Sequence, residues 1–267
     1  MTVDQEAAWA PERRAQSLAR ECLARAVAEL APGHTERDVG ASLRKHAFSL
    51  GARGFFHEPL VWFGERTRLD KSRLKSLPGR TRLQLGDVVM LDIAPNFDGV
   101  PADVSVTTSL GENPTVVKGQ EALRELRARI PERVHSCGTA RELVQWVDSW
   151  ARSAGLELHQ EGYLFHALAH RVYRTPAWPW VNRSVGGVGL AAGIQLFGAA
   201  ALSKLPGFGA RWPFWNDTRA SQRPIGAGLW SFEPHLILTD IGVKWEELLV
   251  VDASGARWLE PDPPAPL

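Results

Sequence analysis

The stretch from residue 85 to residue 110 constrains the fold most, because it places acidic residues inside apolar strands. The apolar run at 88–91 leads directly into Asp92, an Asp-Gly pair at 98–99 marks a turn, and alternating valines follow Asp103. This pattern predicts a hairpin that brings the two carboxylates onto neighbouring strands. Burying a carboxylate without a partner costs several kcal/mol, so we expect a compensating cation or a hydrogen-bond network, and a metal ion is the simplest of these.

The rest of the first half is expected to be mainly helical. Thr35 and Asp38 have the spacing of a capping box, and Pro32 and Gly33 just before them end the preceding helix. Composition and apolar periodicity predict two helices, a strand and a basic loop ahead of the hairpin, over residues 6–31, 35–50, 55–63 and 64–82.

The second half repeats this order. Residues 32–38 (PGHTERD) and 136–142 (SCGTARE) are similar, which suggests an internal duplication with a period of about 104 residues. Coincidence is the alternative, because capping boxes such as Thr139 with Glu142 are common. The elements expected here are two helices, a strand, an aromatic-rich insertion and two further strands, over residues 118–130, 139–154, 163–173, 174–228, 229–236 and 243–251.

Length and charge bound the class of protein. The 267 residues suit a single domain over 1–267, with halves of about 1–115 and 116–260. The 31 basic and 30 acidic residues are balanced and form no basic cluster, so neither nucleic acid nor an anionic membrane is an expected partner. The N-terminus has no apolar signal region, and no segment approaches the roughly 20 apolar residues of a membrane helix. We therefore expect a cytoplasmic protein.

Five side chains that can bind a metal ion fall on predicted strands or strand ends, namely Asp92, Asp103, His170, Glu233 and Glu246. Carboxylates with one imidazole suit divalent manganese, iron or cobalt, and bridging carboxylates can hold two ions close together. Zinc also accepts these donors. Each acid taken singly is more often a solvated residue, so the metal hypothesis depends on the whole set.

Four motifs, in order along nearly the whole chain, resemble those of the pita-bread metallopeptidase family, which includes methionine aminopeptidase, aminopeptidase P, prolidase and creatinase. The Asp motif of the family resembles the hairpin, with the same eleven-residue spacing between its two acids. The His-Gly-Leu-x-His, Thr-x-Glu-Pro and Gly-Val-Arg-x-Glu-Asp motifs resemble HALAH at 166–170, SFEP at 231–234 and GVKWEE at 242–247. The resemblance implies an α+β pita-bread fold, in which two pseudo-twofold duplicated halves surround a curved antiparallel sheet.

The resemblance also implies a centre of two divalent ions. Asp92 would bind one ion, His170 and Glu233 would bind the other, and Asp103 and Glu246 would bridge both. All five ligand positions of the family are filled in this chain.

The implied reaction is attack of a hydroxide, shared by the two ions, on an amide bond of a small substrate or short peptide. Glu233 would transfer the proton, and His166 would orient the substrate. Because His166 and His170 are four residues apart, a hydrogen-bonded structural pair is the alternative for them. Cleavage of Xaa-Pro or N-terminal peptide bonds is the default expectation.

Three departures from the family concern substrate contacts. The family places a histidine in the loop ahead of the first ligand strand, whereas residues 65–85 contain none. Beyond the metal-binding histidine the family has another histidine, but here Trp178 followed by Pro occupies that place. The segment 174–228 is also long and rich in tryptophan. Trp178 is therefore a candidate substrate contact, and His57 is a candidate replacement for a missing histidine.

These departures leave alternatives open. The same metal centre could run non-peptide chemistry on a small molecule, such as creatinase-like C–N hydrolysis, a lyase step or a biosynthetic tailoring reaction. A non-catalytic binding protein is a further alternative, which the filled ligand positions disfavour. The tryptophans of the insertion are otherwise core or interface residues, and a homodimer would provide such an interface.

Overall fold

A computed structural model describes residues 8–68, 77–176, 184–185, 188–205 and 212–261. The first half consists of two helices and a three-stranded antiparallel sheet in the order β1-β2-β5. Its elements are α2 (Ala10–Ala28), α3 (Glu36–Ser49), β1 (Leu60–Phe63), the 3-10 helix η1 (Gly64–Arg68), β2 (Val88–Ile93) and β5 (Val104–Ser109).

The predicted helices of this half are confirmed. Helix α3 begins with the expected capping box, in which the Thr35 hydroxyl accepts a hydrogen bond from the Asp38 amide and the Asp38 carboxylate accepts one from the Thr35 amide. The buried residues of α2 and α3 pack against Val89, Leu91 and Ile93 of β2. Because side chains alternate along a strand, Asp92 faces away from these helices.

The predicted hairpin is also confirmed, with Asp92 paired to Ser105 across β2 and β5. Its turn contains a small ladder of β3 (Asn96–Phe97) and β4 (Val100–Pro101). Asp98 and Gly99 at the tip have φ of 52° and 88°, the left-handed conformation that an Asp-Gly hairpin turn requires.

The second half has the same order of elements, helix followed by antiparallel strands. A five-stranded sheet has the order β10-β7-β11-β14-β15, and a three-stranded sheet has the order β13-β12-β6. The elements are α5 (Pro114–Ser136), α6 (Ala140–Ser153), β6 (Glu157–Leu158), η2 (Leu164–His166), β7 (Ala169–Arg171), β10 (Phe214–Trp215), η4 (Arg219–Ser221), β11 (Gly228–Phe232), β12 (His235–Leu238), β13 (Ile241–Lys244), β14 (Glu247–Asp252) and β15 (Gly255–Trp258).

Several boundaries differ from the sequence prediction. Helix α5 starts earlier and ends later than 118–130, because Asn113 caps its first turn and Pro131 is accommodated inside it. The strand expected over 163–173 shrinks to β7, since Phe165 and His166 have positive φ. The Thr139 hydroxyl caps α6, but the Glu142 carboxylate accepts from the amide of Gly138, so this box is not reciprocal.

The apolar segments of the C-terminal region are divided between two sheets. The segment expected as one strand over 229–236 breaks at Glu233 and Pro234, after which β12 joins a different sheet. Proline lacks an amide donor and interrupts the ladder. The segment expected over 243–251 divides in the same way into β13 and β14, with Trp245 and Glu246 between them.

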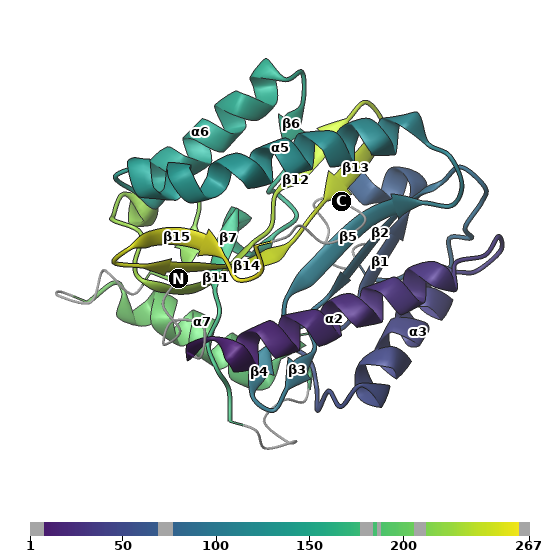
Figure 1. The fold of residues 1–267 in the computed structure, drawn as a ribbon, viewed down its shortest axis with the longest axis horizontal. Helices are drawn as coiled ribbons and strands as arrows, with labels where there is room; N and C mark the ends of the chain where they lie inside the picture. The colour runs from purple at the N-terminus through teal and green to yellow at the C-terminus, as the bar shows by residue number, and fades with distance from the viewer. Residues whose placement is uncertain (1–7, 69–76, 177–183, 186–187, 206–211, 262–267) are drawn as a thin grey trace.

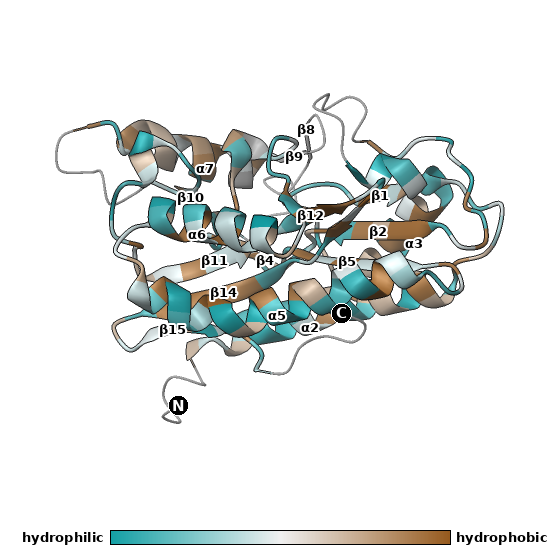
Figure 2. Ribbon diagram, turned by 90° about the horizontal axis from the view of Figure 1, so that it is seen from above, coloured by the Kyte–Doolittle hydropathy of each residue, from teal (hydrophilic) through white to brown (hydrophobic). Residues whose placement is uncertain are grey.

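The insertion predicted over 174–228 has structure of its own. It contains the hairpin β8 (Ser184–Val185) with β9 (Val188–Gly189), helix α7 (Leu190–Leu202), and β10, which extends the five-stranded sheet. Viewed from above, α7 lies on the opposite side of the molecule from α2 and α5 (Figure 2).

The two halves meet where the candidate ligands lie. Helices α2 and α3 lie along one side of the molecule and α5 and α6 along the other, with the strands between them (Figure 1). An isolated bridge joins Ser105 to Glu246, so β5 and β14 start side by side. The order α3-β1-β2-β5 is repeated as α6-β7-β11-β14, and Thr35 and Thr139 cap the equivalent helices. The internal echo in the sequence thus corresponds to a structural duplication.

Candidate metal centre

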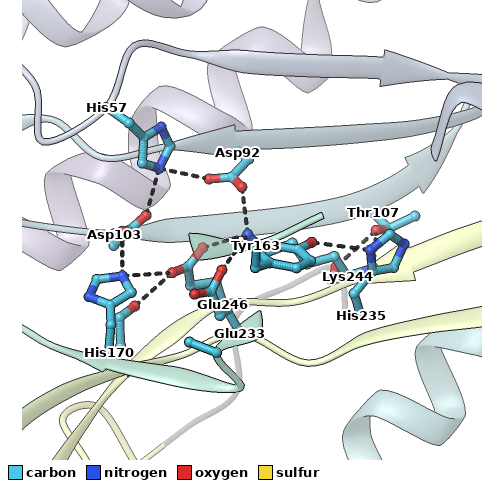
Figure 3. A network of polar contacts seen from close by, with 12 residues as sticks. His57, Asp92, Asp103, Thr107, Tyr163, His170, Glu233, His235, Lys244 and Glu246 are labelled. Carbon is cyan, nitrogen blue, oxygen red and sulfur yellow. Dashed lines mark hydrogen bonds and ion pairs between the residues drawn. The ribbon is translucent and has the colours of Figure 1, made fainter. Parts of the chain in front are cut away.

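The candidate ligands converge from both halves onto one buried cluster (Figure 3). Asp103 directly precedes β5, and Glu246 directly precedes β14. The Ser105–Glu246 bridge brings the starts of these two strands together. Asp92 comes from β2 and His170 from β7. Their residues are between 2% and 8% exposed. Four segments far apart in the sequence therefore present polar groups to one largely buried space.

A first group of donors consists of His57, Asp92 and Asp103. His57 Nε2 lies 3.1 Å from Asp103 Oδ1 and 3.3 Å from Asp92 Oδ1. Its other ring nitrogen, Nδ1, lies 2.9 Å from the carbonyl oxygen of Glu58. The backbone thereby orients the imidazole so that Nε2 points at both carboxylates.

A second group consists of Asp103, His170 and Glu246. His170 Nε2 lies 3.2 Å from Asp103 Oδ2 and 3.9 Å from Glu246 Oε1. The hydroxyl of Ser231 donates to Glu246 Oε1 at 2.8 Å. Asp103 therefore belongs to both groups, with one carboxylate oxygen directed at each imidazole.

Lys244 is a buried cation at the same cluster, and its side chain is only 1% exposed. Its Nζ lies 2.5 Å from Asp92 Oδ2, 2.9 Å from Glu246 Oε2 and 3.3 Å from Glu233 Oε2. The ring of Tyr163 covers the ammonium at 4.8 Å, and the Tyr163 hydroxyl forms a hydrogen bond with His235 Nδ1 at 3.1 Å. Lys244 thus links the carboxylate of Asp92 from the first half with those of Glu233 and Glu246 from the second half.

Burial and mutual charge shift the pKa values in this cluster in opposite directions. Burial and the neighbouring Asp103 raise the pKa of Glu246 well above its usual value, and burial also raises that of Glu233. Burial alone would raise the pKa of Asp103, but His57 and His170 hold it well below its usual value. Burial alone would lower the pKa of Lys244, but Asp92 and Glu246 raise it well above its usual value.

The residues present fit a divalent metal. The cluster contains four carboxylates, one ammonium and two imidazoles, so its carboxylates outnumber its one permanently charged cation, Lys244. Among the described residues, Asp92 Oδ1 and Glu246 Oε2 are buried and accept no well-formed hydrogen bond, although His57 and Lys244 lie near them. Oxygens in this condition are ready ligands for a hard or borderline cation.

The structure places the sequence-predicted residues as follows. Asp92, Asp103, His170 and Glu246 belong to the two donor groups, whereas Glu233 approaches the cluster through Lys244. His57, expected as a substrate contact, lies among the candidate ligands. His166 is an exposed residue at the end of η2. Trp178 lies outside the described residues, so its predicted contact with substrate stays a prediction.

Three residues in contact with the cluster, Lys244, Tyr163 and Phe56, were not predicted from the sequence. Lys244 is two residues from Glu246, and residues two apart on an extended chain share a face, so its position was available from the motif GVKWEE. Tyr163 had no such signal, because it reaches Lys244 only through the packing of a separate loop. Phe56, stacked on His170 with centroids 5.0 Å apart, depends likewise on long-range packing.

Two aromatic residues of the insertion are core residues, and the aromatic residues of the pocket beside the cluster come from outside the insertion. Phe214 and Trp215 are buried in hydrophobic clusters, and Trp215 packs against Trp230 with centroids 4.8 Å apart. For these two, the structure supports the core interpretation. A pocket that reaches Asp103 and His170 is lined instead by residues that include Phe56, Tyr173, Gln195 and Leu196.

The model of metallopeptidase family M24 matches residues 12–253. The chain belongs to this family. No protein in a sequence comparison with curated proteins matches the chain. Within the described residues of this M24 chain, no helix combines the length and the apolar character needed to cross a membrane.

Solved structures similar to this M24 chain include three peptidases. They are the X-Pro aminopeptidase of Thermotoga maritima (19% identity, TM-score 0.66, 95% of this chain and 61% of that one), the prolidase of Pyrococcus furiosus (19%, 0.65, 94% and 63%) and the dipeptidase PepE of Mycobacterium ulcerans (22%, 0.65, 96% and 59%). The chain spans about three fifths of the length of these proteins. The likeness establishes the α+β pita-bread fold predicted from sequence.

Proposed function

We propose that the protein is a metal-dependent hydrolase that cleaves an amide bond in a small substrate, with Xaa-Pro or N-terminal peptide bonds as the default. The observation that carries this proposal is the buried convergence of Asp92, Asp103, His170 and Glu246, drawn from both halves of the fold. Buried carboxylates without matching cations would destabilise the protein, which makes a structural role for this set costly.

In this proposal Asp92 would hold one divalent ion, His170 and Glu233 would hold the other, and Asp103 and Glu246 would contribute to both. When bound, divalent manganese, iron or cobalt, or alternatively zinc, supplies Lewis acidity that activates water and polarises a carbonyl. The two oxygens of Asp103 already point towards different imidazoles, at 3.1 and 3.2 Å, which suits a bridging role.

Glu233 is the proposed proton carrier. Burial raises the pKa of its carboxyl group, so it takes up a proton more readily than a solvated glutamate does. Lys244 holds Oε2 of Glu233 at 3.3 Å, which fixes the carboxylate beside the donor groups. It would accept the proton of the attacking water and deliver it to the leaving nitrogen. His166 and Trp178 are the proposed substrate contacts.

Space for a small substrate adjoins the cluster. The pocket at Asp103 and His170 shares Pro101 and Tyr173 with a larger hollow of about 380 Å³, which Trp9 also lines. This volume is within the range of small-molecule sites. Its lining combines apolar and aromatic residues with the charged Glu12, Arg171 and Arg174, which suits a dipeptide or a similar compact amide.

A second candidate function is non-peptide C–N hydrolysis on the same centre. Residues 65–85 contain no histidine, and Trp178 stands where the family has another, so two family contacts to peptide substrates are missing from this chain. A substrate that does not need those contacts fits these changes.

The test is a substrate panel with metal-loaded protein. Xaa-Pro dipeptides, N-terminal tripeptides and small non-peptide amides are incubated with protein reconstituted separately with Mn²⁺, Co²⁺ and Fe²⁺, and product amines are quantified. Release from peptides supports the first candidate, and release from non-peptide amides alone supports the second. Inactivity towards the whole panel by protein that holds bound metal would contradict both hydrolase candidates.

A further inference from the structure

We propose that His57 is itself a metal ligand, the imidazole counterpart of His170 in the first half of the fold. This inference rests on the proposed function, because it requires a divalent ion at the cluster. It replaces the role in substrate contact that the sequence suggested for His57.

The distances around His57 match those between donors that share an ion. Two donors bound at about 2.1 Å and at right angles to each other lie about 3.0 Å apart. His57 Nε2 lies 3.1 Å from Asp103 Oδ1 and 3.3 Å from Asp92 Oδ1. The side chain is 15% exposed, against 10% for His170, so both imidazoles are largely withdrawn from water.

The backbone sets which ring nitrogen of His57 can donate. A carbonyl oxygen only accepts, so the contact of 2.9 Å between Nδ1 and the Glu58 carbonyl places a hydrogen on Nδ1. Nε2 is then the nitrogen that faces the two carboxylate oxygens: with a hydrogen it donates to them, and without one its lone pair can bind a cation held between the three atoms. Metal-binding histidines commonly donate their other N–H to a backbone carbonyl, as His57 Nδ1 does here.

His170 has the same arrangement. Its Nδ1 lies 3.3 Å from the carbonyl oxygen of the next residue, Arg171, as His57 Nδ1 does from that of Glu58. The Nε2 atom of His170 contacts Oδ2 of Asp103, and the Nε2 atom of His57 contacts Oδ1 of the same carboxylate. Phe56 contacts both rings, stacked on His170 and edge-on to His57 at 5.9 Å.

The duplication of the fold explains this correspondence. His57 precedes β1 and His170 lies in β7, and these strands occupy the same place in the two repeated series. Each half then contributes one imidazole and two carboxylates: His57, Asp92 and Asp103 from the first, and His170, Glu233 and Glu246 from the second. The centre is thus pseudo-symmetric in its ligands as well as in its strands.

The test compares metal binding, without substrate, in the wild type and in three histidine variants. Mn²⁺ affinity and stoichiometry are measured by equilibrium dialysis for H57A, H170A and H135A, the last removing an exposed histidine of α5. If His57 is a ligand, H57A should weaken the affinity for one of the two Mn²⁺ ions by about 100-fold or more and leave the other ion bound. H135A should bind as the wild type does.

A spectroscopic count of imidazoles keeps the proposal testable if H57A folds poorly. Pulsed electron paramagnetic resonance of the Mn²⁺-loaded wild type should show nitrogen couplings from two histidines, and H170A should retain one. A single coupled imidazole in the wild type, or unchanged Mn²⁺ affinity in folded H57A, would overturn the assignment of His57 while leaving the metal enzyme intact. A wild type that binds no Mn²⁺, Co²⁺ or Fe²⁺ would overturn the proposed function as well.

Discussion

Lys244 is the residue on which the metal-free cluster most depends. Its ammonium contacts Asp92, Glu246 and Glu233 within 3.3 Å and is covered by Tyr163. Removing one member of a buried charge group leaves its partners uncompensated. Lys244 therefore stabilises the fold and lowers the excess negative charge that attracts a metal.

Replacing Lys244 by methionine should separate these two effects. We expect K244M to lose about 3–5 kcal/mol of unfolding free energy without metal, because three carboxylates lose their shared cation. Added Mn²⁺ should recover more stability in K244M than in the wild type, since binding to the native state stabilises it. Urea unfolding with and without Mn²⁺ measures both quantities, and K244R is the charge-preserving control. Equal metal-free stability of K244M and the wild type would refute this role.

At the scale of elements, α5 approaches β13 so closely that only glycine fits at their contact. A Cβ added to Gly119 would lie 2.7 Å from Cγ1 and 2.8 Å from Cγ2 of Val243. Val243 directly precedes Lys244 in β13, so this contact fixes the position of the strand end that carries the ammonium.

Two glycine-to-alanine substitutions in helices test this contact. G119A should destabilise the protein, because overpacking costs about 1–3 kcal/mol, more than the helix gain of about 0.5–1 kcal/mol. G198A in α7, where a Cβ would meet nothing within 4 Å, should stabilise by about that helix gain. Thermal unfolding of both variants gives the comparison, and stabilisation by G119A would show that the contact is looser than described.

Elements whose signals are local were predictable from the sequence, and those set by distant contacts were not. The capping box at Thr35 and the Asp-Gly turn of the hairpin involve residues within a few positions of one another. The break between β11 and β12 depends on which sheet accepts the chain after Pro234, which no local pattern specifies. For the same reason the four ligand motifs could be recognised in the sequence, but the position of His57 beside Asp92 and Asp103 could not be predicted.

At the scale of the whole molecule, one buried carboxylate connects α2 and α5 to the five-stranded sheet. Glu247 at the start of β14 is completely buried and accepts hydrogen bonds from Arg20 of α2 at 2.6 Å and from Arg127 of α5 at 2.8 and 2.9 Å. Arg127 also donates to the carbonyl of Glu260 at 2.9 Å. This network joins the two halves next to Glu246, so we expect them to unfold together as one domain.

E247Q should therefore destabilise the entire protein in one cooperative step. The amide keeps the shape but loses the charge that two arginines require, at a cost of about 3–5 kcal/mol. E125Q removes an exposed pair with Arg129 four residues away and should cost less than about 0.5 kcal/mol. Denaturant unfolding followed by fluorescence and circular dichroism checks this, and separate transitions for the two halves would argue against a single domain.

We propose that divalent ions bind where the two halves meet, and the metal content of the purified protein tests this binding. The wild type and D103N are loaded with Mn²⁺ or Co²⁺, dialysed at neutral pH, and analysed for metal per chain by mass spectrometry. Because Asp103 faces both imidazoles, we predict about two ions per wild-type chain and loss of retained metal in D103N. A wild type that retains no metal, or a folded D103N that retains the full amount, would contradict a metal centre that includes Asp103.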